Sequence, residues 1–328
     1  MKRTFPILIT LLLIISIPST AQEKPGFFRK VDNVLRGMHQ NNKMDSTYVV
    51  IPAEKLGVRL STEISQNWIE GHGYVDKQPL DMRLVSETRF KEKLTVSYRN
   101  LALGVAYGPR KIKGQKDGLK LSLKSYGNKF GFNVSCDRKN IYGGNVTYGD
   151  EGTTYTDVPG QNTTCSAEIY YACNRKFSMN SVYGMSFIQK KSAGSVFFTV
   201  DGIIDRTFVT ADENIGNPAI ALTGAYLGFG AGYGYNYVPA EGWTIHTSVL
   251  PALFFVENSK LSVGNARQVH KGYVPDFCAT ARLGVNHQMG HWFAGLDASF
   301  KDMGVGRARI ARTDHMTLLC TVSLGRRF

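Results

Sequence analysis

The sequence has no long apolar run beyond its first residues. After residue 21, no apolar stretch reaches the roughly 18 residues that a transmembrane helix requires. The five cysteines show no CxxC spacing, so neither a zinc site nor a complete disulfide framework is indicated, and we expect most of them to pack as small apolar residues. A GxSxG motif is also missing, which removes the main sequence signature of an α/β-hydrolase. We therefore expect neither a helical membrane protein nor a zinc protein, and no metal or cofactor.

The N-terminus has the three parts of a secretory signal peptide. Residues 1–3 are basic at positions 2 and 3, Phe5–Ile17 is mostly apolar, and small residues precede a cleavage site after Ala21. No cysteine follows, so a lipoprotein is not indicated. We predict a signal peptide over residues 1–21, a periplasmic segment over residues 22–53 and an exported domain over residues 54–328.

The chain is basic, with 39 Lys and Arg against 26 Asp and Glu and a formal net charge of +13. Because we expect the chain to be exported, we do not attribute its positive charge to a nucleic-acid partner, and none is predicted. A solvated loop surface or contact with anionic lipid headgroups explains the charge better. The densest basic cluster, Arg110–Lys113 with Lys116, would bind lipopolysaccharide phosphates from an outer loop and would be a solvated turn on the periplasmic side.

The last segment, His315–Phe328, alternates with a period of two residues, which is typical of a β-strand whose faces have different solvents. A strand of about 9–11 such residues can cross a membrane in a barrel. Arg326 departs from the pattern, because it falls on the mostly apolar face. The segment alone would also fit a strand of a soluble sandwich. The terminal Phe328 resembles the aromatic signal that the barrel-assembly machinery recognises.

Further strand patterns fill the chain from residue 55 onward. Leu119–Leu123 and Phe130–Cys136 predict a hairpin around Gly127, and Cys165–Cys173 with Phe177–Ile188 predict another. Ala221–Tyr237 places a row of glycines on one face and a tyrosine cluster on the other. We predict an all-β protein, a transmembrane antiparallel barrel of about 12 strands, within roughly 10 to 14. The spacing over Pro25–Met38 adds a short amphipathic N-terminal helix.

Several segments together resemble a known family. They are the signal peptide, the short N-terminal helix, D-S-T-Y-V at Asp45–Val49, Q-K-K-S-A-G-S at Gln189–Ser195, G-A-G-Y-G-Y-N-Y at Gly230–Tyr237 and the terminal Phe328. The sequence resembles an uncharacterised family of Bacteroidetes outer-membrane β-barrels defined as a domain of unknown function. The resemblance implies an outer-membrane barrel over most of residues 40–328, and it implies no catalytic residues.

Two pairs of residues, each with at least one histidine, are the candidates for catalysis or metal binding. His246 and Ser248 lie two residues apart on one predicted strand, so they share a face, and a serine hydrolase needs such a pair to activate its nucleophile. Lining of the barrel interior is the alternative role, and the one we favour. His287 and His291 flank a predicted turn and would supply at most two metal ligands, which is too few for a closed zinc site.

Arg282 and Asp297 fall on the inner faces of adjacent predicted strands, and they are the candidates for a lumenal charge pair. Three functions remain open. The first is a structural or small-solute channel protein of the outer membrane, in contact with outer-membrane lipids and lipopolysaccharide. The second is a barrel enzyme that acts on lipid or lipid A through His246 and Ser248. The third is a binding module that presents outer loops such as Asp205–Asn217 and Glu257–Gly272.

Overall fold

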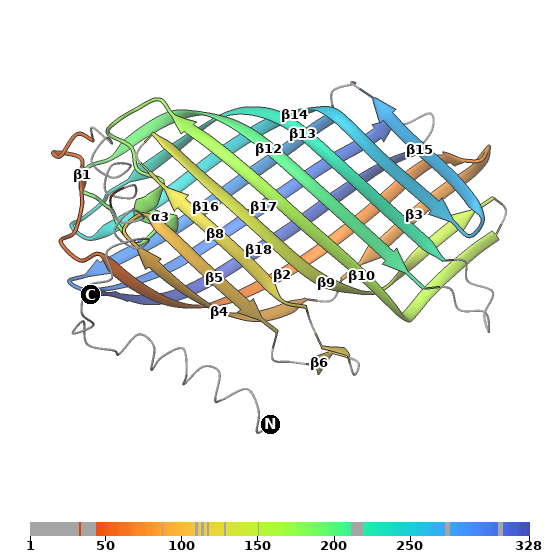
Figure 1. Cartoon of the computed structure of the whole chain (residues 1–328), viewed down its shortest axis with the longest axis horizontal. Helices are drawn as coiled ribbons and strands as arrows, with labels where there is room; N and C mark the ends of the chain where they lie inside the picture. Colours follow the sequence, from red (N-terminus) through yellow and green to blue (C-terminus); the bar gives the residue numbers. More distant parts are fainter. Residues whose placement is uncertain are drawn as a thin grey trace.

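The chain forms a closed antiparallel barrel of 12 strands (Figure 1). This computed structural model describes residue 33 and residues 44–328, except 87, 109–110, 113–114, 117, 128, 150, 211–218, 273–275 and 308–310. The barrel strands are β2 (Leu56–Val75), β4 (Arg89–Tyr98), β5 (Leu101–Tyr107), β8 (Lys120–Tyr126), β9 (Phe130–Tyr148), β10 (Glu151–Ala172), β12 (Ala193–Val209), β13 (Ile220–Tyr237), β14 (Trp243–Val263), β16 (Asp276–Met289), β17 (Trp292–Arg307) and β18 (Ala311–Arg327). The predicted fold class and strand number are confirmed.

Smaller elements decorate the barrel. They are β1 (Val49–Val50), β3 (Gln78–Val85), β6 (Lys111–Ile112), β7 (Gln115–Lys116), α3 (Asn180–Tyr183), β11 (Ile188–Gln189) and β15 (Ala266–Gly272). The predicted signal peptide and N-terminal helix fall on residues that, apart from residue 33, lie outside the described part of the chain. No helix within the described ranges is both long enough and apolar enough to cross a membrane.

The first and last barrel strands close the wall. β18 pairs with β2 from Arg327 opposite Gly57 to Ala311 opposite Gly73. The N–H of Phe328 donates to the Leu56 carbonyl at 2.8 Å, and the N–H of Leu56 donates to the Phe328 carbonyl at 3.2 Å. Because these bonds join the two ends of the sheet, the main barrel has no open edge at this seam.

The outside of the barrel body is apolar. Side chains such as Leu103, Ile204 and Leu283 point away from the lumen and are 57%, 63% and 60% exposed. At the end of the barrel that holds the C-terminus, exposed aromatic side chains form a ring: Tyr98, Phe130, Tyr237, Trp243, Trp292 and Phe328. Arg326 lies in this ring with its guanidinium over the rings of Trp292 and Phe328, at 5.4 and 5.0 Å. That position explains how a charged residue fits on the apolar face, because its head lies at the interfacial ring.

At the opposite end the pattern inverts. Inward side chains of β2, β3, β9, β12, β13 and β14 form an apolar cluster: Ile69, Val75, Leu80, Met82, Leu84, Val146, Val209, Ile220, Leu222, Leu261 and Val263. The outward side chains there include a His72–Asp81 pair at 3.5 Å and an Arg83–Glu70 pair at 3.3 Å. Charged pairs on the exterior around an apolar core are typical of a part that is exposed to water. We call this end the distal extension.

Different strands form the barrel wall in the body and in the distal extension. β4, β5 and β8 are short, and beyond them β3 fills the space between β2 and β9. The predicted strand Leu94–Tyr107 is two strands, because Arg99 with a φ of 54° and Asn100 form a tight turn between β4 and β5. β6 and β7, which lie between β5 and β8, are consequently on the side away from the C-terminus, and Arg110 and Lys113 of the predicted basic cluster lie outside the described residues. The β14–β15 hairpin lies at the same distal end.

The predicted hairpin of Cys165–Cys173 with Phe177–Ile188 is wrong. Cys165 belongs to the long strand β10, which pairs with β9 and β12. Residues 173–192 instead fold into the barrel end near the C-terminus and contain α3 and β11, which pairs with β1. We call residues 173–192 the plug. Its apolar side chains alternate partly like those of a strand because Phe177, Met185 and Phe187 are buried inside the barrel mouth.

Candidate functional site: a charged chamber inside the barrel

A cavity of about 300 Å³ lies in the lumen between the plug and the distal extension. Tyr126 and Tyr183 line it at the plug side, and Ile69 and Leu84 of the apolar cluster line it at the other. Most of its remaining lining is polar or charged. This is expected for the inner face of a barrel strand, since alternate residues face lipid and lumen. We call this cavity the chamber.

The charges of the chamber are distributed unequally. On β2, β8, β9 and β4, four lysines line it with two carboxylates: Lys91, Lys120, Lys124 and Lys139 with Glu63 and Asp137. We call this side the basic wall. Behind it lie three further inward cations: Arg59, Arg89 and Lys93. The opposite side, from β10 to β17, has four carboxylates and two cations: Glu168, Asp201, Asp205 and Asp297 with Arg282 and Lys301.

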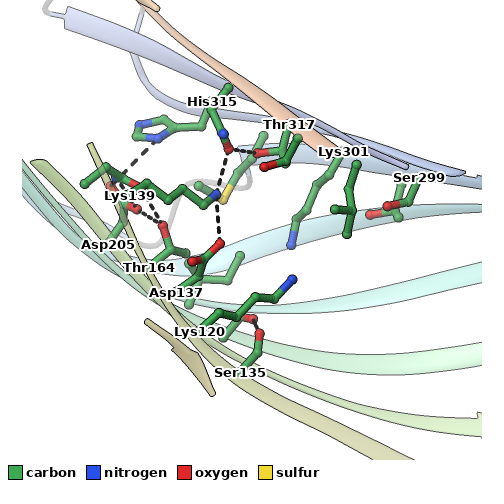
Figure 2. A pocket seen from close by; sticks show the side chains of 18 of the residues that line it. Lys120, Ser135, Asp137, Lys139, Thr164, Asp205, Ser299, Lys301, His315 and Thr317 are labelled. Carbon is green, nitrogen blue, oxygen red and sulfur yellow. Dashed lines mark hydrogen bonds and ion pairs between the residues drawn. The ribbon is translucent and has the colours of Figure 1, made fainter. Parts of the chain in front are cut away.

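Each carboxylate of the basic wall serves two lysines. Glu63 binds Lys93 Nζ at 2.8 Å through Oε1 and Lys120 Nζ at 2.6 Å through Oε2. Asp137 binds Lys91 Nζ at 2.5 Å, and Lys139 Nζ lies 3.9 Å away and also donates to Asn67 at 2.7 Å. These contacts are not made between direct register partners, because Glu63 is opposite Lys91 and Asp137 is opposite Lys120. Figure 2 shows Lys139 and Asp137 side by side in the chamber. Each cluster keeps an excess positive charge.

The two residues predicted to form a lumenal charge pair do not contact each other as an ion pair. Arg282 and Asp297 both line the chamber, as predicted for inward residues of β16 and β17. Arg282 Nη2 donates to Glu168 Oε2 at 2.7 Å, however, and β10, which carries Glu168, lies across the lumen. In the described part of the chain, no carboxylate–cation contact within 4.0 Å involves Asp297. Arg282 therefore pairs across the barrel and not with the neighbouring strand.

His246 and Ser248 lie inside the barrel, and Asn236 of β13 completes a chain of hydrogen bonds. His246 Nε2 is 2.9 Å from Ser248 Oγ, and His246 Nδ1 is 2.7 Å from Asn236 Oδ1. Sequence reasoning missed Asn236, because the register of β13 on β14, which places it opposite His246, is visible only in the fold. A Ser–His–Asn chain has the hydrogen-bonding order of a nucleophile, its base and an orienting group. Yet the His246 side chain is fully buried, and it packs against Phe177 and Tyr183 of the plug.

Asn236 also holds the plug. Its Nδ2 donates to the Ser178 carbonyl at 2.8 Å and approaches Ser181 Oγ at 3.3 Å and Gln189 Oε1 at 3.2 Å. The His246 chain thus ends on the plug and not at the lipid surface. We assign it a positioning role for the plug in this closed arrangement.

Other barrel strands also hold the plug through hydrogen bonds. Arg327 Nε donates to the Met185 carbonyl at 2.6 Å, and Arg59 Nη2 donates to the Tyr183 carbonyl at 3.2 Å. Asn180 of α3 donates to the Tyr126 carbonyl at 2.7 Å and accepts from the N–H groups of Ser186 and Phe187 at 2.8 and 3.0 Å. Together with Asn236 of β13, these contacts come from β2, β8 and β18, so they hold the plug from several sides of the mouth.

His287 and His291 make separate contacts at the barrel end. His287 stacks on Trp243 with ring centroids 4.2 Å apart, and His291 Nδ1 lies 2.6 Å from Glu54 Oε1. A hydrogen bond from its own backbone N–H, followed by the charge of His291, holds the pKa of Glu54 below its usual value against the opposing effect of burial. These contacts give His287 and His291 structural roles at the barrel end. Nowhere among the described residues do three His, Cys, Asp or Glu side chains form a group that could hold a metal.

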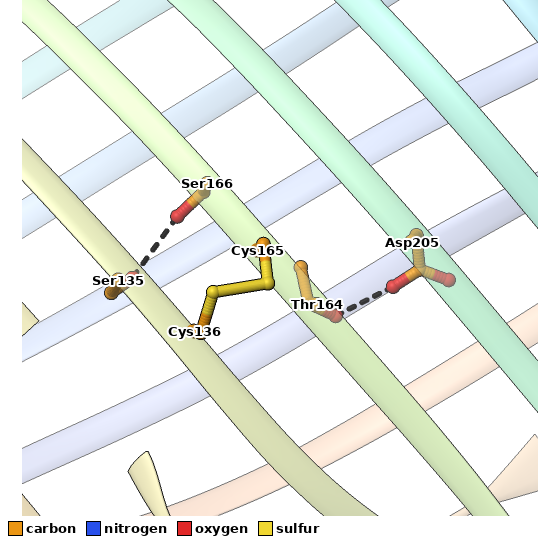
Figure 3. Close-up of a disulfide and its surroundings, with 6 residues drawn as sticks. All are labelled: Ser135, Cys136, Thr164, Cys165, Ser166 and Asp205. Atoms are coloured by element: carbon orange, nitrogen blue, oxygen red, sulfur yellow. Dashed lines mark hydrogen bonds between the residues drawn. A yellow bond between two sulfur atoms is a disulfide. The ribbon is translucent and has the colours of Figure 1, made fainter. Parts of the chain in front are cut away.

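A disulfide joins Cys136 of β9 to Cys165 of β10 on the outer face of the wall (Figure 3). The two residues are direct partners in the strand register, with Cα atoms 4.1 Å apart. On the adjacent inward positions, Ser135 and Ser166 share a hydrogen bond of 3.1 Å. This bond is not predicted from the sequence, where we expect most of the cysteines to pack as small apolar residues. Cys173, Cys278 and Cys320 are free.

A closed antiparallel barrel with an even strand number, an apolar exterior with an aromatic ring and a charged lumen is a transmembrane β-barrel of the class found in outer membranes. The chain belongs to the family described as domain of unknown function DUF4421, whose model matches residues 43–328. No curated protein matches the chain.

Solved outer-membrane barrels resemble the chain at low sequence identity. The outer membrane protease OmpT from Escherichia coli is 7% identical with a TM-score of 0.45, over 85% of this chain and 98% of that one. The translocator domain of the autotransporter NalP from Neisseria meningitidis is 12% identical with a TM-score of 0.38, over 92% and 96%. The COG4313 outer membrane channel from Pseudomonas putida F1 is 8% identical with a TM-score of 0.34, over 87% and 99%. These similarities carry no conclusion about function.

Proposed function

We propose that the protein is a gated outer-membrane channel for small polar solutes, with the plug as its gate. The signal peptide predicted over residues 1–21 would export it, and the barrel-assembly machinery would insert it with the termini in the periplasm. In that orientation the distal extension and the β5–β8 loop face the cell exterior, where lipopolysaccharide is the neighbouring lipid.

The observation that carries this proposal is the chamber. A barrel with only a structural role needs a filled interior, and apolar side chains fill it at the least cost, as they do in the distal extension. The membrane-spanning part instead encloses about 300 Å³ among lysines, arginines and carboxylates. Holding many charges around a cavity is costly unless water or a polar solute occupies it. A chamber for polar solutes is consistent with that cost.

The construction of the plug supports a gate. It is a connection between β10 and β12, it adds no strand to the barrel wall, and polar contacts make much of its attachment. Moving it would therefore break a limited set of hydrogen bonds and leave the wall intact. The chamber would then open toward the end that holds the C-terminus.

Conductance in a planar bilayer tests the proposal. We expect rare or small current steps from the full chain, and frequent, larger steps when residues 176–187 are replaced by a glycine–serine linker of equal length. The matched control is Glu241→Gln, in the β13–β14 turn at the same end of the barrel. Silence from the folded plug variant, or the same increase in the control, would contradict a gate.

The hydrogen bonds among Asn236, His246 and Ser248 favour a second candidate function, hydrolysis by a serine nucleophile. In this function the plug would cover the nucleophile, and its movement would admit the substrate from the lumen. The burial of His246 inside the barrel places the group away from the lipid surface, which disfavours hydrolysis of membrane lipid.

A further inference from the structure

We infer that the chamber binds a small oxyanion between Lys120 and Lys124 of β8 and Lys301 of β17. This inference rests on the proposed function in one respect, since the chamber must open to admit a solute. It adds the chemical class of that solute: a molecule that carries a phosphate or carboxylate group.

Two lysines of the chamber lack a partner among the described residues. Lys124 and Lys301 both line the chamber, and neither makes a hydrogen bond or an ion pair within the described part of the chain. Lys120 shares Glu63 with Lys93, so that cluster keeps an excess positive charge. The carboxylates of Asp201 and Glu168 act on Lys301 only from beyond ion-pair distance. An ammonium inside a barrel without a partner is costly, and a bound anion would remove that cost.

Lys120 and Lys301 extend into the chamber from different strands. Figure 2 shows Lys120 and Lys301 reaching from opposite sides into the same part of the chamber. The strand neighbours of Lys301 are Thr280 and Thr317, which are neutral and offer it no counter-charge. Two ammonium groups that face each other repel, and an anion between them converts this repulsion into attraction.

Neutral side chains near these lysines supply additional hydrogen-bond donors. Asn133 is the register partner of Lys124, and Ser135 follows two residues later on the same inward face. Each ammonium carries three N–H donors, and an amide or hydroxyl adds more. Phosphate and carboxylate groups accept several such bonds at once. The cations Arg59, Arg89 and Lys93 behind the basic wall make its potential more positive, which also favours an anion.

Isothermal titration of the detergent-folded full chain with inorganic phosphate, and separately with acetate, tests the site at constant ionic strength. Both the natural chain and the plug-linker variant are titrated, so that access through the gate is controlled. We expect saturable binding, weakened roughly tenfold or more by Lys301→Met and by Lys124→Met. The matched control is Lys129→Met, because Lys129 belongs to the same β8–β9 hairpin but its ammonium lies over the Tyr171 ring. Heat-modifiable gel mobility verifies folding, and Lys301→Arg restores the charge where the methionine variant misfolds.

Binding of phosphate assigns a phosphate-bearing solute, and binding of acetate alone assigns a carboxylate-bearing one. Absence of binding to the plug-linker variant, or equal affinities in the Lys301→Met, Lys124→Met and natural chains, would overturn the site. The two proposals fail separately. A plug-linker variant that conducts without binding either anion would remove the oxyanion site and keep the channel, whereas one that binds phosphate without conducting would do the reverse.

Discussion

Arg282 Nη2 lies 2.7 Å from Glu168 Oε2, and this contact joins β16 to β10 across the inside of the barrel. Three strands, β12, β13 and β14, separate the two residues along the wall. Both side chains are largely buried, with 19% and 14% of their surfaces exposed. The pair therefore acts as a cross-brace between opposite parts of the wall.

Breaking this brace should destabilise the barrel. Arg282→Met would leave the Glu168 carboxylate without its cation, and loss of one partner of a buried pair costs about 3–5 kcal/mol, with about 2 kcal/mol reasonable at this partial exposure. Urea unfolding of the protein in lipid vesicles, followed by tryptophan fluorescence, measures the change. Arg282→Met with Glu168→Met should regain most of the loss, because neither charge then remains. Equal losses in the single and double variants would contradict the brace.

The sequence predicts the wall of the barrel well and its interior contacts poorly. Alternation alone identifies β18 and β13, because every second side chain must meet lipid and the exposed Leu324, Val322 and Phe229 satisfy that rule strand by strand. The partner of Arg282 depends on the stagger of all intervening strands and on the diameter of the barrel. Adjacent-strand reasoning therefore selects Asp297, whereas the closed barrel brings Glu168 into contact.

The plug shows a second limit. Apolar alternation records burial, and Phe177 and Phe187 are buried inside the barrel mouth and not in its wall. A pattern that is produced by packing inside the lumen cannot be distinguished from a strand by periodicity. Asn180, which is buried and polar, is the contrary signal, since its amide donates to the Tyr126 carbonyl of the wall and accepts from the Ser186 N–H of the plug.

The Cys136–Cys165 disulfide should stabilise the barrel by constraining the unfolded chain. The 29-residue separation corresponds to about 3–4 kcal/mol in the chain-entropy description. The double change Cys136→Ser and Cys165→Ser should lower the free energy of unfolding by up to that amount, and a reductant should then have no further effect. Cys173→Ser is the matched control, because Cys173 is free and exposed. Alkylation of both Cys136 and Cys165 in the protein purified without reductant would contradict the bond.

Variants of the Asn236–His246–Ser248 group separate a positioning role from catalysis. Ser248→Ala should leave the rate of ester hydrolysis unchanged and alter unfolding by about 1 kcal/mol, the usual value of one hydrogen bond. Asn236→Ala should increase conductance, because it removes the contacts to Ser178 and to His246 and so weakens the hold on the plug. A hydrolytic activity of the natural chain that disappears in Ser248→Ala would instead establish the enzyme function.

Phe328 allows assembly in the cell to be separated from stability of the finished barrel. Its backbone closes the seam with Leu56, and any residue except proline at position 328 can make those bonds. Its side chain is 54% exposed and contacts Arg326 through a cation–π interaction of about 0.5–1 kcal/mol. Phe328→Ala should therefore unfold in vesicles within about 1 kcal/mol of the natural chain. If the ring is the signal for the assembly machinery, the same variant should give several-fold less folded protein in outer-membrane fractions, and Phe328→Tyr should restore it. Equal amounts of folded Phe328→Ala and natural protein in those fractions would show that the ring has no such role. Any loss of folded protein on deletion of residue 328 would then result from the missing backbone hydrogen bonds to Leu56.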